Sequence, residues 1–509
     1  MASKNPLQDK PDDFEGLLTE MRAVYASGKT KSYNYRMAQM KAMKRMMEVE
    51  EDAISEALAA DLGRCKFESV GLEVVGLIAE INLMLDNLKS WMEPEYTSIP
   101  GLMAPATNEI VYEPLGVCLI IGAFNYPIML TLSPLLGAIV AGNVAVIKPS
   151  EMSSATERLI ADMLPRYLDG DAYRVVCGGI QTNIGLLNER WDKIFFTGSI
   201  RVGKIVAQAA AKHLTPTCLE LGGKSPVIID EALPDMEVVT QRICWGKFAN
   251  AGQTCIAPDY VLCHEKHYDA FCEAVVRKTR KFYGENAKES PDYGRIVSPE
   301  HTKRLKGLLD DKPGRVLNGG NVDVSDRYVE PTIIAEARLD SKLMSDEIFG
   351  PILPIIKVKS VDEACKIIKT MEKPLALYMF SQNRSVIDRV CKEITSGGVL
   401  VNDCLYHFGN PYTPFGGVGP SGMGGYHGRF SFDAFSHRRT IMRRDTTALL
   451  DVPMRYPPYT ASGLSTFKLL AANAGSMPSI TRRTVGFAVL AVVCASVAVV
   501  MGMQYKKEF

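Results

Sequence analysis

The fold is decided by the stretch "LGVCLIIGAFNYPIMLTLSPLLGAIVAGNVAVIKPS", Leu115–Ser150, which carries no charge before its last three residues. Its first apolar run ends at Asn125 and Pro127, which predicts a buried strand followed by a turn. The next run, closed by Gly142 and Asn143, has the length of a helix, and "VAVIK" predicts a second buried strand. The order of these segments predicts a βαβ unit of a parallel sheet, not a membrane span.

Further short apolar strands follow this unit and are separated by helical stretches: "VVCGGI", "KIFFTGS", "SPVIID" and "YVLCHEK". This alternation is typical of a doubly wound α/β fold. Before the unit, Phe14–Trp91 has helical character, and methionines recur at positions 37, 40, 43, 46 and 47. We expect these methionines to pack in the core. A chain of 509 residues has room for two to four domains.

Composition excludes several classes of function. Lys plus Arg and Asp plus Glu are both 58, so the chain lacks the basic surface that nucleic-acid binding requires. The twelve cysteines form no CxxC pair, which argues against a zinc ribbon or a redox dithiol and favours reduced, cytosolic thiols. The closest histidines, His264 and His267, lie in the charged stretch "HEKHYD". We therefore predict no metal site.

The two ends of the sequence differ in character. The start, "MASKNPLQDKPDD", is polar and does not have the apolar core of a signal peptide. In contrast, Val485–Met503 is 19 residues without a charge, which as a helix would extend about 28 Å, close to the hydrocarbon thickness of a bilayer. Two basic residues flank it on each side, so charge does not decide its orientation. We expect a C-terminal anchor, with the preceding residues in the cytosol.

Three glycine motifs compete to define a ligand site. "GVGPSG", Gly417–Gly422, follows no strand and contains a proline, so we interpret it as a turn. "GGKS", Gly222–Ser225, is not preceded by the glycine of a P-loop and is followed by Pro226, which excludes a nucleoside triphosphatase. "FFTGSIRVG" follows a strand and leads into a helix, so its turn can present backbone N–H groups to phosphate. The residues concerned are Thr197, Gly198, Ser199 and Gly203.

One cysteine stands in an unusual setting, "FANAGQTCIAPDY", Phe248–Tyr260. An ordinary thiol has a pKa near about 8.5, so a nucleophilic cysteine needs oriented dipoles or a base. The segment "ANAGQTC" resembles the catalytic-cysteine motif of the aldehyde dehydrogenase superfamily, and "LELGGKSP" resembles its catalytic-glutamate motif. The blocks "FNYP", "IKPSE", "FTGS", "EIFGP" and "PFGGVGPSG" resemble further family motifs in the same order, so that the resemblance covers residues 15 to 445.

The resemblance implies a catalytic set. Cys255 attacks the aldehyde, Asn125 and the backbone N–H of Cys255 stabilise the oxyanion, and Glu220 activates the water that hydrolyses the thioester. The apolar setting of Glu220, "TPTCLELGG", favours burial and a raised pKa. The products are a carboxylic acid and a reduced nicotinamide.

The resemblance also implies a cofactor set. Lys148 and Glu151 would lie at the adenosine ribose, and Glu347 and Phe349 at the nicotinamide ribose and ring. A carboxylate at Glu151 accepts the 2′-hydroxyl of NAD and repels the 2′-phosphate of NADP. NAD is therefore favoured, and NADP stays open because class 3 relatives use both.

The stretches "GYHGRFSFDAFSHRR" and "RYPPY" resemble the class 3 branch, whose fatty aldehyde dehydrogenase members carry a C-terminal anchor. This similarity implies a medium- to long-chain aliphatic aldehyde as substrate, and a homodimer with a bridging β-element near "RRTIMRR", Arg438–Arg444. It places the protein on a membrane with its catalytic domain facing the cytosol. The endoplasmic reticulum is the first choice, ahead of a peroxisome-type organelle and the mitochondrial outer membrane.

The predicted architecture combines a Rossmann-type cofactor domain, an α/β catalytic domain, a bridging β-element and a transmembrane helix. By residue, we expect N-terminal helices and the NAD(P)-binding domain over 1–221, the catalytic domain over 222–400, a return to the cofactor domain with the bridging element over 401–455, a linker or amphipathic lid ("TFKLLAAN", Thr466–Asn473) within 456–483, and the anchor over 484–503.

Two other classes stay open. One is a cysteine acyl-transfer or thioesterase-type enzyme that uses Cys255 and Glu220 without nicotinamide; the set "FTGSIRVG", Lys148 and "EIFGP" speaks against it. The other is a catalytically silent membrane scaffold on the same fold, against which the joint presence of Cys255, Glu220 and Asn125 argues.

Overall fold

The computed structural model describes residues 14–100, 103, 106–444, 446, 451 and 453–472. These residues form two compact units. The first comprises residues 14–88 and 114–435 and contains two large sheets; the second comprises 89–113 together with the described residues from 436 onward.

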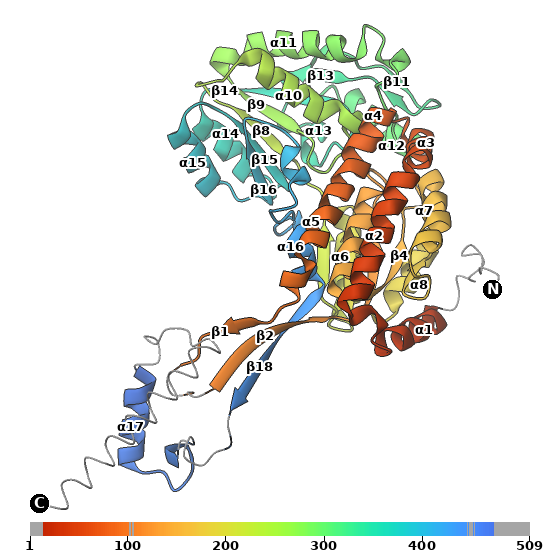
Figure 1. Cartoon of the computed structure of the whole chain (residues 1–509). Helices are drawn as coiled ribbons and strands as arrows, with labels where there is room; N and C mark the ends of the chain where they lie inside the picture. Colours follow the sequence, from red (N-terminus) through yellow and green to blue (C-terminus); the bar gives the residue numbers. More distant parts are fainter. Residues whose placement is uncertain are drawn as a thin grey trace, which may run out of the picture. The chain divides into compact units, whose positions relative to one another are not determined.

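The first unit begins with helices that cover one side of the first sheet (Figure 1). Ser32 caps the second helix by accepting a hydrogen bond from the N–H of Tyr35. Four of the five methionines of this helix are fully buried, and only Met37 is partly exposed, which confirms their predicted place in the core. The helices are α1 (Phe14–Ala26), α2 (Tyr33–Val49), α3 (Glu51–Leu62), α4 (Lys66–Ser69) with a following π-turn (Val70–Val74), and α5 (Val75–Trp91).

The first sheet confirms the predicted βαβ unit. Strands β3 and β4 are parallel and buried along their whole length, and the helix α6 between them is buried on all faces. The sheet order is β17-β7-β6-β3-β4-β5, parallel apart from β17, which runs antiparallel to β7. The elements are β3 (Val117–Ile121), α6 (Met129–Ala141), β4 (Val144–Lys148), α7 (Ser154–Tyr167), β5 (Tyr173–Val175), α8 (Ile180–Asn188), β6 (Lys193–Thr197), α9 (Ile200–Ala211), β7 (Thr217–Glu220) and β17 (Gly422–Met423).

The second sheet is also mainly parallel, with the order β10-β13-β14-β9-β8-β15-β16 and only β10 antiparallel to its neighbour. Its strands are β8 (Pro226–Ile229), β9 (Tyr260–His264), β10 (Arg315–Asn318), β13 (Thr332–Ala335), β14 (Ile352–Val358), β15 (Ala376–Phe380) and β16 (Gly398–Val401). The helices are α10 (Met236–Phe248), α11 (Glu265–Tyr283), α12 (Pro299–Asp310), α13 (Lys342–Ser345), α14 (Val361–Lys369) and α15 (Arg384–Glu393), and a small hairpin joins β11 (Val322–Asp323) to β12 (Tyr328–Val329).

The chain then returns to the first sheet. The segment "GVGPSG" forms a turn, as predicted, in which the N–H of Gly422 bonds to the carbonyl of Gly419. Helix α16 (Gly428–Ala434) packs on α6. The α/β fold with two Rossmann-like sheets is therefore confirmed, whereas the division into domains at residues 221 and 400 stays a prediction.

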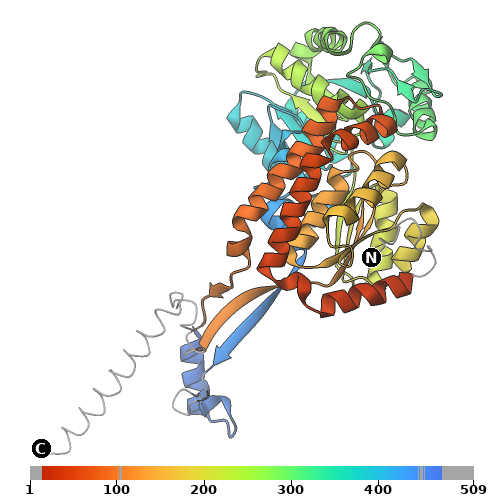
Figure 2. The same cartoon turned by 45° about the vertical axis from the view of Figure 1, so that its right-hand side comes forward.

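The second unit contains a three-stranded sheet of order β1-β2-β18, with β2 and β18 side by side in both views (Figures 1 and 2). Its strands are β1 (Glu95–Thr97), β2 (Ala106–Pro114) and β18 (Ser436–Arg444), so a β-element does occupy the predicted residues 438–444. Cross-strand ion pairs join Arg439 to Glu113 and Arg443 to Glu109. Helix α17 (Ala461–Ala472) includes all of the predicted lid except Asn473.

The predicted anchor, 484–503, lies outside the described residues. Within the part of the chain that is described, none of the helices has both the length and the apolarity needed to cross a membrane.

Candidate active site

The predicted residues of the first sheet gather at one edge. Four parallel strands in the order β7-β6-β3-β4 end there, at Glu220, at Thr197, shortly before Asn125 and at Lys148. Thr197 pairs with Glu220 in the strand register, and the N–H of Gly198 donates to the carbonyl of Glu220 at 3.0 Å. Between β3 and β6 the strand order reverses direction, and ligands of open parallel sheets bind outside the carboxyl ends of strands at such a point.

Cys255 comes to this edge from the other sheet, on the loop that joins α10 to β9. A turn at Ala249–Gly252 precedes it, in which Asn250, Ala251 and Gly252 all have left-handed backbone conformations (φ 52°, 50° and 73°). A side chain at position 252 would meet the carbonyl oxygen of Gly350 at 2.4 Å. The chain thus enters the Cys255 loop through a tight turn that at position 252 requires glycine.

Two hydrogen bonds fix the cysteine loop against the segment that follows β3. The side-chain amide of Asn125 donates to the carbonyl of Gln253 at 3.0 Å, and the hydroxyls of Tyr126 and Thr254 lie 2.7 Å apart. Asn125 itself is 3% exposed. Direct contacts between adjacent residues therefore bring Asn125 and Cys255 together, although they are 130 positions apart in the sequence.

The electrostatic setting of Cys255 keeps its proton in place at rest. Burial raises the pKa of the thiol above its ordinary value, and the carboxyl groups of Glu347 and Glu220 raise it further. The backbone N–H groups of Cys255 and Ile256 act in the opposite direction. Cys255 therefore needs a proton acceptor when it reacts as a thiolate.

Glu220 is a buried carboxyl group at the end of β7, 3% exposed. Burial raises the pKa of Glu220 well above its ordinary value, and the Cys218 thiol, 3.8 Å from Oε1, lowers it slightly. The second oxygen, Oε2, has no hydrogen-bond partner among the described residues. A raised pKa makes the carboxylate form of Glu220 a stronger base than that of an exposed glutamate, which suits a general base.

The phosphate-binding candidates form the start of α9. Ser199 caps this helix by accepting from the N–H of Val202, while the hydroxyl of Thr197 is buried and is without a partner in the described chain. Gly203 lies inside the helix, where an added side chain would meet Leu221 at 2.5 Å. Because glycine has no side chain, the helix can approach the segment after Glu220. The helix N-terminus at the sheet edge fits a dinucleotide phosphate.

Lys148 and Glu151 are brought together directly. The ammonium group of Lys148 lies 2.5 Å from Glu151 and 2.8 Å from the carbonyl of Pro149. The lysine is buried, whereas the Glu151 carboxylate is partly exposed, so this pair can face a polar ligand at the strand end.

Glu347 lies against the glycines that follow Glu220. A side chain at Gly222 would meet its carboxyl oxygen at 2.0 Å, and the N–H of Gly223 donates to it. Burial and then Asp259 raise the pKa of Glu347 to about 8. Phe349 has a left-handed backbone (φ 47°), and its ring meets Phe124 edge-on at 5.6 Å. The residues of this edge fit a nicotinamide dinucleotide, because two buried polar atoms, Glu347 Oε1 and Thr197 Oγ1, are unpartnered in the described chain.

Sequence reasoning missed an ion pair that holds the Glu347 loop. Lys224 lies 2.5 Å from Asp259 and donates to the carbonyls of Leu343 and Asp346 at 3.0 and 2.9 Å. Asp259 in turn accepts from the N–H of Ile348. Lys224 belongs to "GGKS", which is part of the glutamate motif "LELGGKSP". This position was the signal from which its role could have been predicted.

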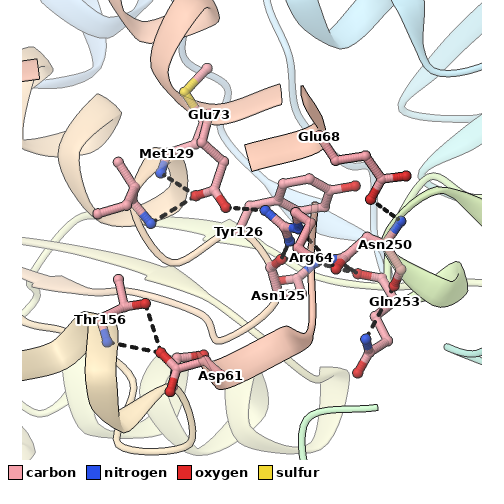
Figure 3. Close-up of polar contacts among 12 residues, drawn as sticks. Asp61, Arg64, Glu68, Glu73, Asn125, Tyr126, Met129, Thr156, Asn250 and Gln253 are labelled. Carbon is pink, nitrogen blue, oxygen red and sulfur yellow. Dashed lines mark hydrogen bonds and ion pairs between the residues drawn. The ribbon is translucent and has the colours of Figure 1, made fainter. Parts of the chain in front are cut away.

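Sequence reasoning also missed the charged residues beneath Asn125. Arg64 donates to the carbonyl of Asn125 and pairs with Glu73, and the uncharged Asn250 amide donates to the same carbonyl (Figure 3). Nothing in the local sequence of Arg64 indicates a partner 61 or 186 positions away.

Known proteins resemble this chain over most of its length. A family model described as "Aldehyde dehydrogenase family" matches residues 7–441. Aldehyde dehydrogenase family 3 member A2 of Rattus norvegicus is 46% identical over 454 residues, which is 89% of this chain and 93% of the relative. Aldehyde dehydrogenase, dimeric NADP-preferring, of the same organism is 46% identical over 86% of this chain and 96% of its own. A solved structure of Staphylococcus aureus AldH in a substrate-bound state is 42% identical with a TM-score of 0.86, covering 89% of this chain and 98% of its own.

Proposed function

The chain belongs to the aldehyde dehydrogenase family, and we propose that Cys255, Glu220 and Asn125 carry the oxidation of aldehydes that this membership establishes for it. The protein is an NAD(P)-dependent oxidoreductase that converts an aldehyde to a carboxylic acid. The observation that carries the assignment of residues is the hydrogen bond of the Asn125 amide to Gln253, two positions before Cys255, beside the buried Glu220 carboxyl.

In the first step the sulfur of Cys255 attacks the aldehyde carbon, and its proton leaves for a base. The carbonyl oxygen becomes an oxyanion. One N–H of the Asn125 amide is used by Gln253, and the other is donated to the oxyanion together with the backbone N–H of Cys255. Loss of one such donor costs about 2.7–4 kcal/mol in the barrier.

Collapse of the oxyanion expels a hydride from the carbon, and a bound NAD(P) would supply the acceptor for it. A thioester then links the acyl group to Cys255. Glu220 removes a proton from water, the hydroxide attacks the thioester carbon, and the carboxylic acid leaves as the Cys255 sulfur is released. The raised pKa of Glu220 suits this role, because its carboxylate takes up a proton more strongly than that of an ordinary glutamate.

The chain offers three groups of residues to the cofactor. The N-terminus of α9, with Thr197, Gly198 and Ser199, would hold the pyrophosphate, with Gly203 allowing the helix to lie close. Lys148 and Glu151 would bind the adenosine ribose. Glu347 and Phe349 would lie at the nicotinamide end. The partly exposed Glu151 carboxylate favours NAD, and NADP use is also compatible because Lys148 already neutralises that charge at 2.5 Å.

We assign medium- to long-chain aliphatic aldehydes as substrates, since the apolar segment 485–503 would hold the enzyme at a lipid surface where such aldehydes partition. The test is NADH formation by the full-length protein in detergent with propanal, hexanal, hexadecanal and benzaldehyde. We expect kcat/KM to rise along the aliphatic series and to exceed that for benzaldehyde. Equal values would refute the chain-length assignment. No NADH or NADPH from any aldehyde would refute the reaction and favour the acyl-transfer enzyme or the silent scaffold.

The same segment is the proposed membrane anchor, with the catalytic unit in the cytosol and the endoplasmic reticulum as first location. Full-length protein made in a cell-free system should float with liposomes after alkaline washing. Replacing Val492 and Val497 by arginine should release most of it, because each central arginine costs about 2.5–3.5 kcal/mol of insertion. Val485→Leu together with Val499→Leu is the control and should stay bound. Retention of the double-arginine variant would contradict a membrane span.

We further propose a homodimer that shares the β1-β2-β18 sheet. Strand β18 lies at the edge of this sheet, and most of its side chains are exposed. An edge strand offers free backbone groups for pairing with a second copy. The name of the NADP-preferring relative, which calls that protein dimeric, supports the same assembly.

A further inference from the structure

The last turn of α3 and the segment from there to α5 send charged side chains into the interior near the candidate active site (Figure 3). Asp61, Arg64 and Glu73 are all buried. Asp61 accepts three hydrogen bonds from Ala155 and Thr156 and so holds the start of α7. Arg64 points toward Asn125 instead, and Glu73 points toward Arg64. The segment therefore contacts the framework of the site at more than one place.

The guanidinium group of Arg64 forms hydrogen bonds to both of the chain segments that meet at the reaction centre. Nη2 donates to the carbonyl of Asn125 at 2.5 Å, and Nε donates to the side-chain oxygen of Asn250 at 3.2 Å. The Cζ atom of Arg64 also lies 4.8 Å from the centre of the Tyr126 ring. Because the fork is planar and rigid, the two acceptors are held at a fixed separation.

The acceptors are joined to each other as well. The Asn250 amide donates to the carbonyls of Asn125 and Gln253 at 2.8 and 3.1 Å, and the Asn125 amide donates to the same carbonyl of Gln253. Arg64, Asn125, Gln253 and Asn250 thus close a ring of hydrogen bonds. The ring fixes the peptide and the amide of Asn125 against the left-handed turn that leads to Cys255.

Two carboxyl groups complete this arrangement. Glu73 pairs with Nη1 of Arg64 and accepts from the N–H groups of Ile128 and Met129 at 2.8 and 3.0 Å. Glu68 accepts from the N–H of Asn250 at 3.0 Å. The Glu73 carboxylate therefore compensates the buried charge of Arg64, and the same carboxylate binds the start of α6.

We propose that Arg64 is a positioning residue of the oxidation: it sets where the Asn125 amide lies relative to Cys255 by holding Asn125 and Asn250 in one guanidinium fork. The inference rests on the proposed function, because it concerns the oxyanion donor assigned there. Arg64 does not touch the reacting atoms. It acts through Asn125, so an experiment can detect its role as an effect on kcat that depends on the Asn125 side chain.

The experiment is a double-mutant cycle of Arg64→Lys and Asn125→Ala, with kcat measured per active site titrated with a thiol reagent. Lysine keeps the charge but has no fork, so it cannot hold both acceptors in the same geometry. We expect Arg64→Lys to lower kcat about 10- to 100-fold in the wild-type background, the cost of a small misplacement. In the Asn125→Ala background it should lower kcat less than about threefold, since its target is gone.

Arg36→Lys is the matched control. Arg36 is also buried and also binds backbone carbonyls, those of Thr30 and Val140, but at the far end of α6. It should lower the melting temperature without changing kcat per titrated site by more than about twofold. Circular dichroism spectra of all variants should match that of the wild type.

A merely structural role predicts the same factor for Arg64→Lys in both backgrounds, and that result overturns the proposal, as does a wild-type kcat for Arg64→Lys. If Arg64→Lys does not fold, Asn250→Gly takes its place in the cycle, because glycine keeps the left-handed turn and removes one acceptor. An equal loss in both backgrounds, or none, again overturns the proposal. A wild-type protein that oxidises no aldehyde refutes the proposed function instead, independently of the ratio between variants.

Discussion

Cys255→Ala is expected to lower kcat for aldehyde oxidation by about a millionfold, to background, as happens when the nucleophile of a covalent catalyst is removed. The alanine variant has no atom that can form the thioester, so hydride loss from a covalent adduct no longer occurs. The measurement is NADH formation with hexanal, beside a direct determination of bound NAD. Binding of NAD should be retained, because the contacts of the cofactor set do not depend on the sulfur.

The same thiol should respond to pH in a defined direction. Burial, Glu347 and Glu220 raise the pKa of Cys255, so the reactive thiolate is scarce at neutral pH and its fraction increases as the pH rises. Inactivation by iodoacetamide in the absence of cofactor should therefore speed up about tenfold per pH unit below that pKa. Cys391→Ser, which removes an exposed thiol, should be inactivated at the wild-type rate. Turnover by Cys255→Ala would contradict the assignment of the nucleophile.

The parts of the fold that the sequence predicts are those with an unambiguous burial pattern. Strands β3 and β4 are apolar at nearly every position and are bounded by proline and glycine, so both their type and their limits follow from the residues. Strand β18, "SHRRTIMRR", is mostly exposed and charged. Its position was expected only from resemblance, because polar edge strands carry no periodic signal strong enough to read.

The candidate site divides in the same way. Cys255, Glu220 and Asn125 belong to sequence motifs that resemble those of a known family, so the sequence predicts them. The contacts between the segments around these residues are seen only in the structure. Arg64 stands in no motif, because what matters about it is a guanidinium that reaches across 61 and 186 positions. The left-handed turn at Asn250 and Ala251 is equally silent in the sequence, since an alanine gives no sign that it adopts a positive φ.

Glu220→Gln should separate the two halves of the reaction. Without a base to activate water, the thioester forms but is not hydrolysed, so steady-state kcat should fall about 10²- to 10⁴-fold. The first turnover should survive and appear as a burst of about one NADH per active site. Mass spectrometry of the quenched protein should find the acyl group on the peptide that contains Cys255.

The assignment of Glu220 as the base also predicts the direction in which kcat changes with pH. Burial raises the pKa of Glu220, so its carboxyl group keeps its proton to a higher pH than an exposed glutamate does, and the basic form increases as the pH rises through that pKa. Where hydrolysis limits turnover, wild-type kcat should therefore rise with pH, and the glutamine variant should lose this rise. Glu80→Gln is the control, because Glu80 is equally buried but bonds to Ser133 and Gly428 away from Cys255, and its profile should match that of the wild type. A glutamine variant at position 220 that hydrolyses its acyl-enzyme at the wild-type rate would assign the base to another group. Glu347, half-buried and with a pKa raised to about 8, is the other carboxyl group that raises the pKa of Cys255.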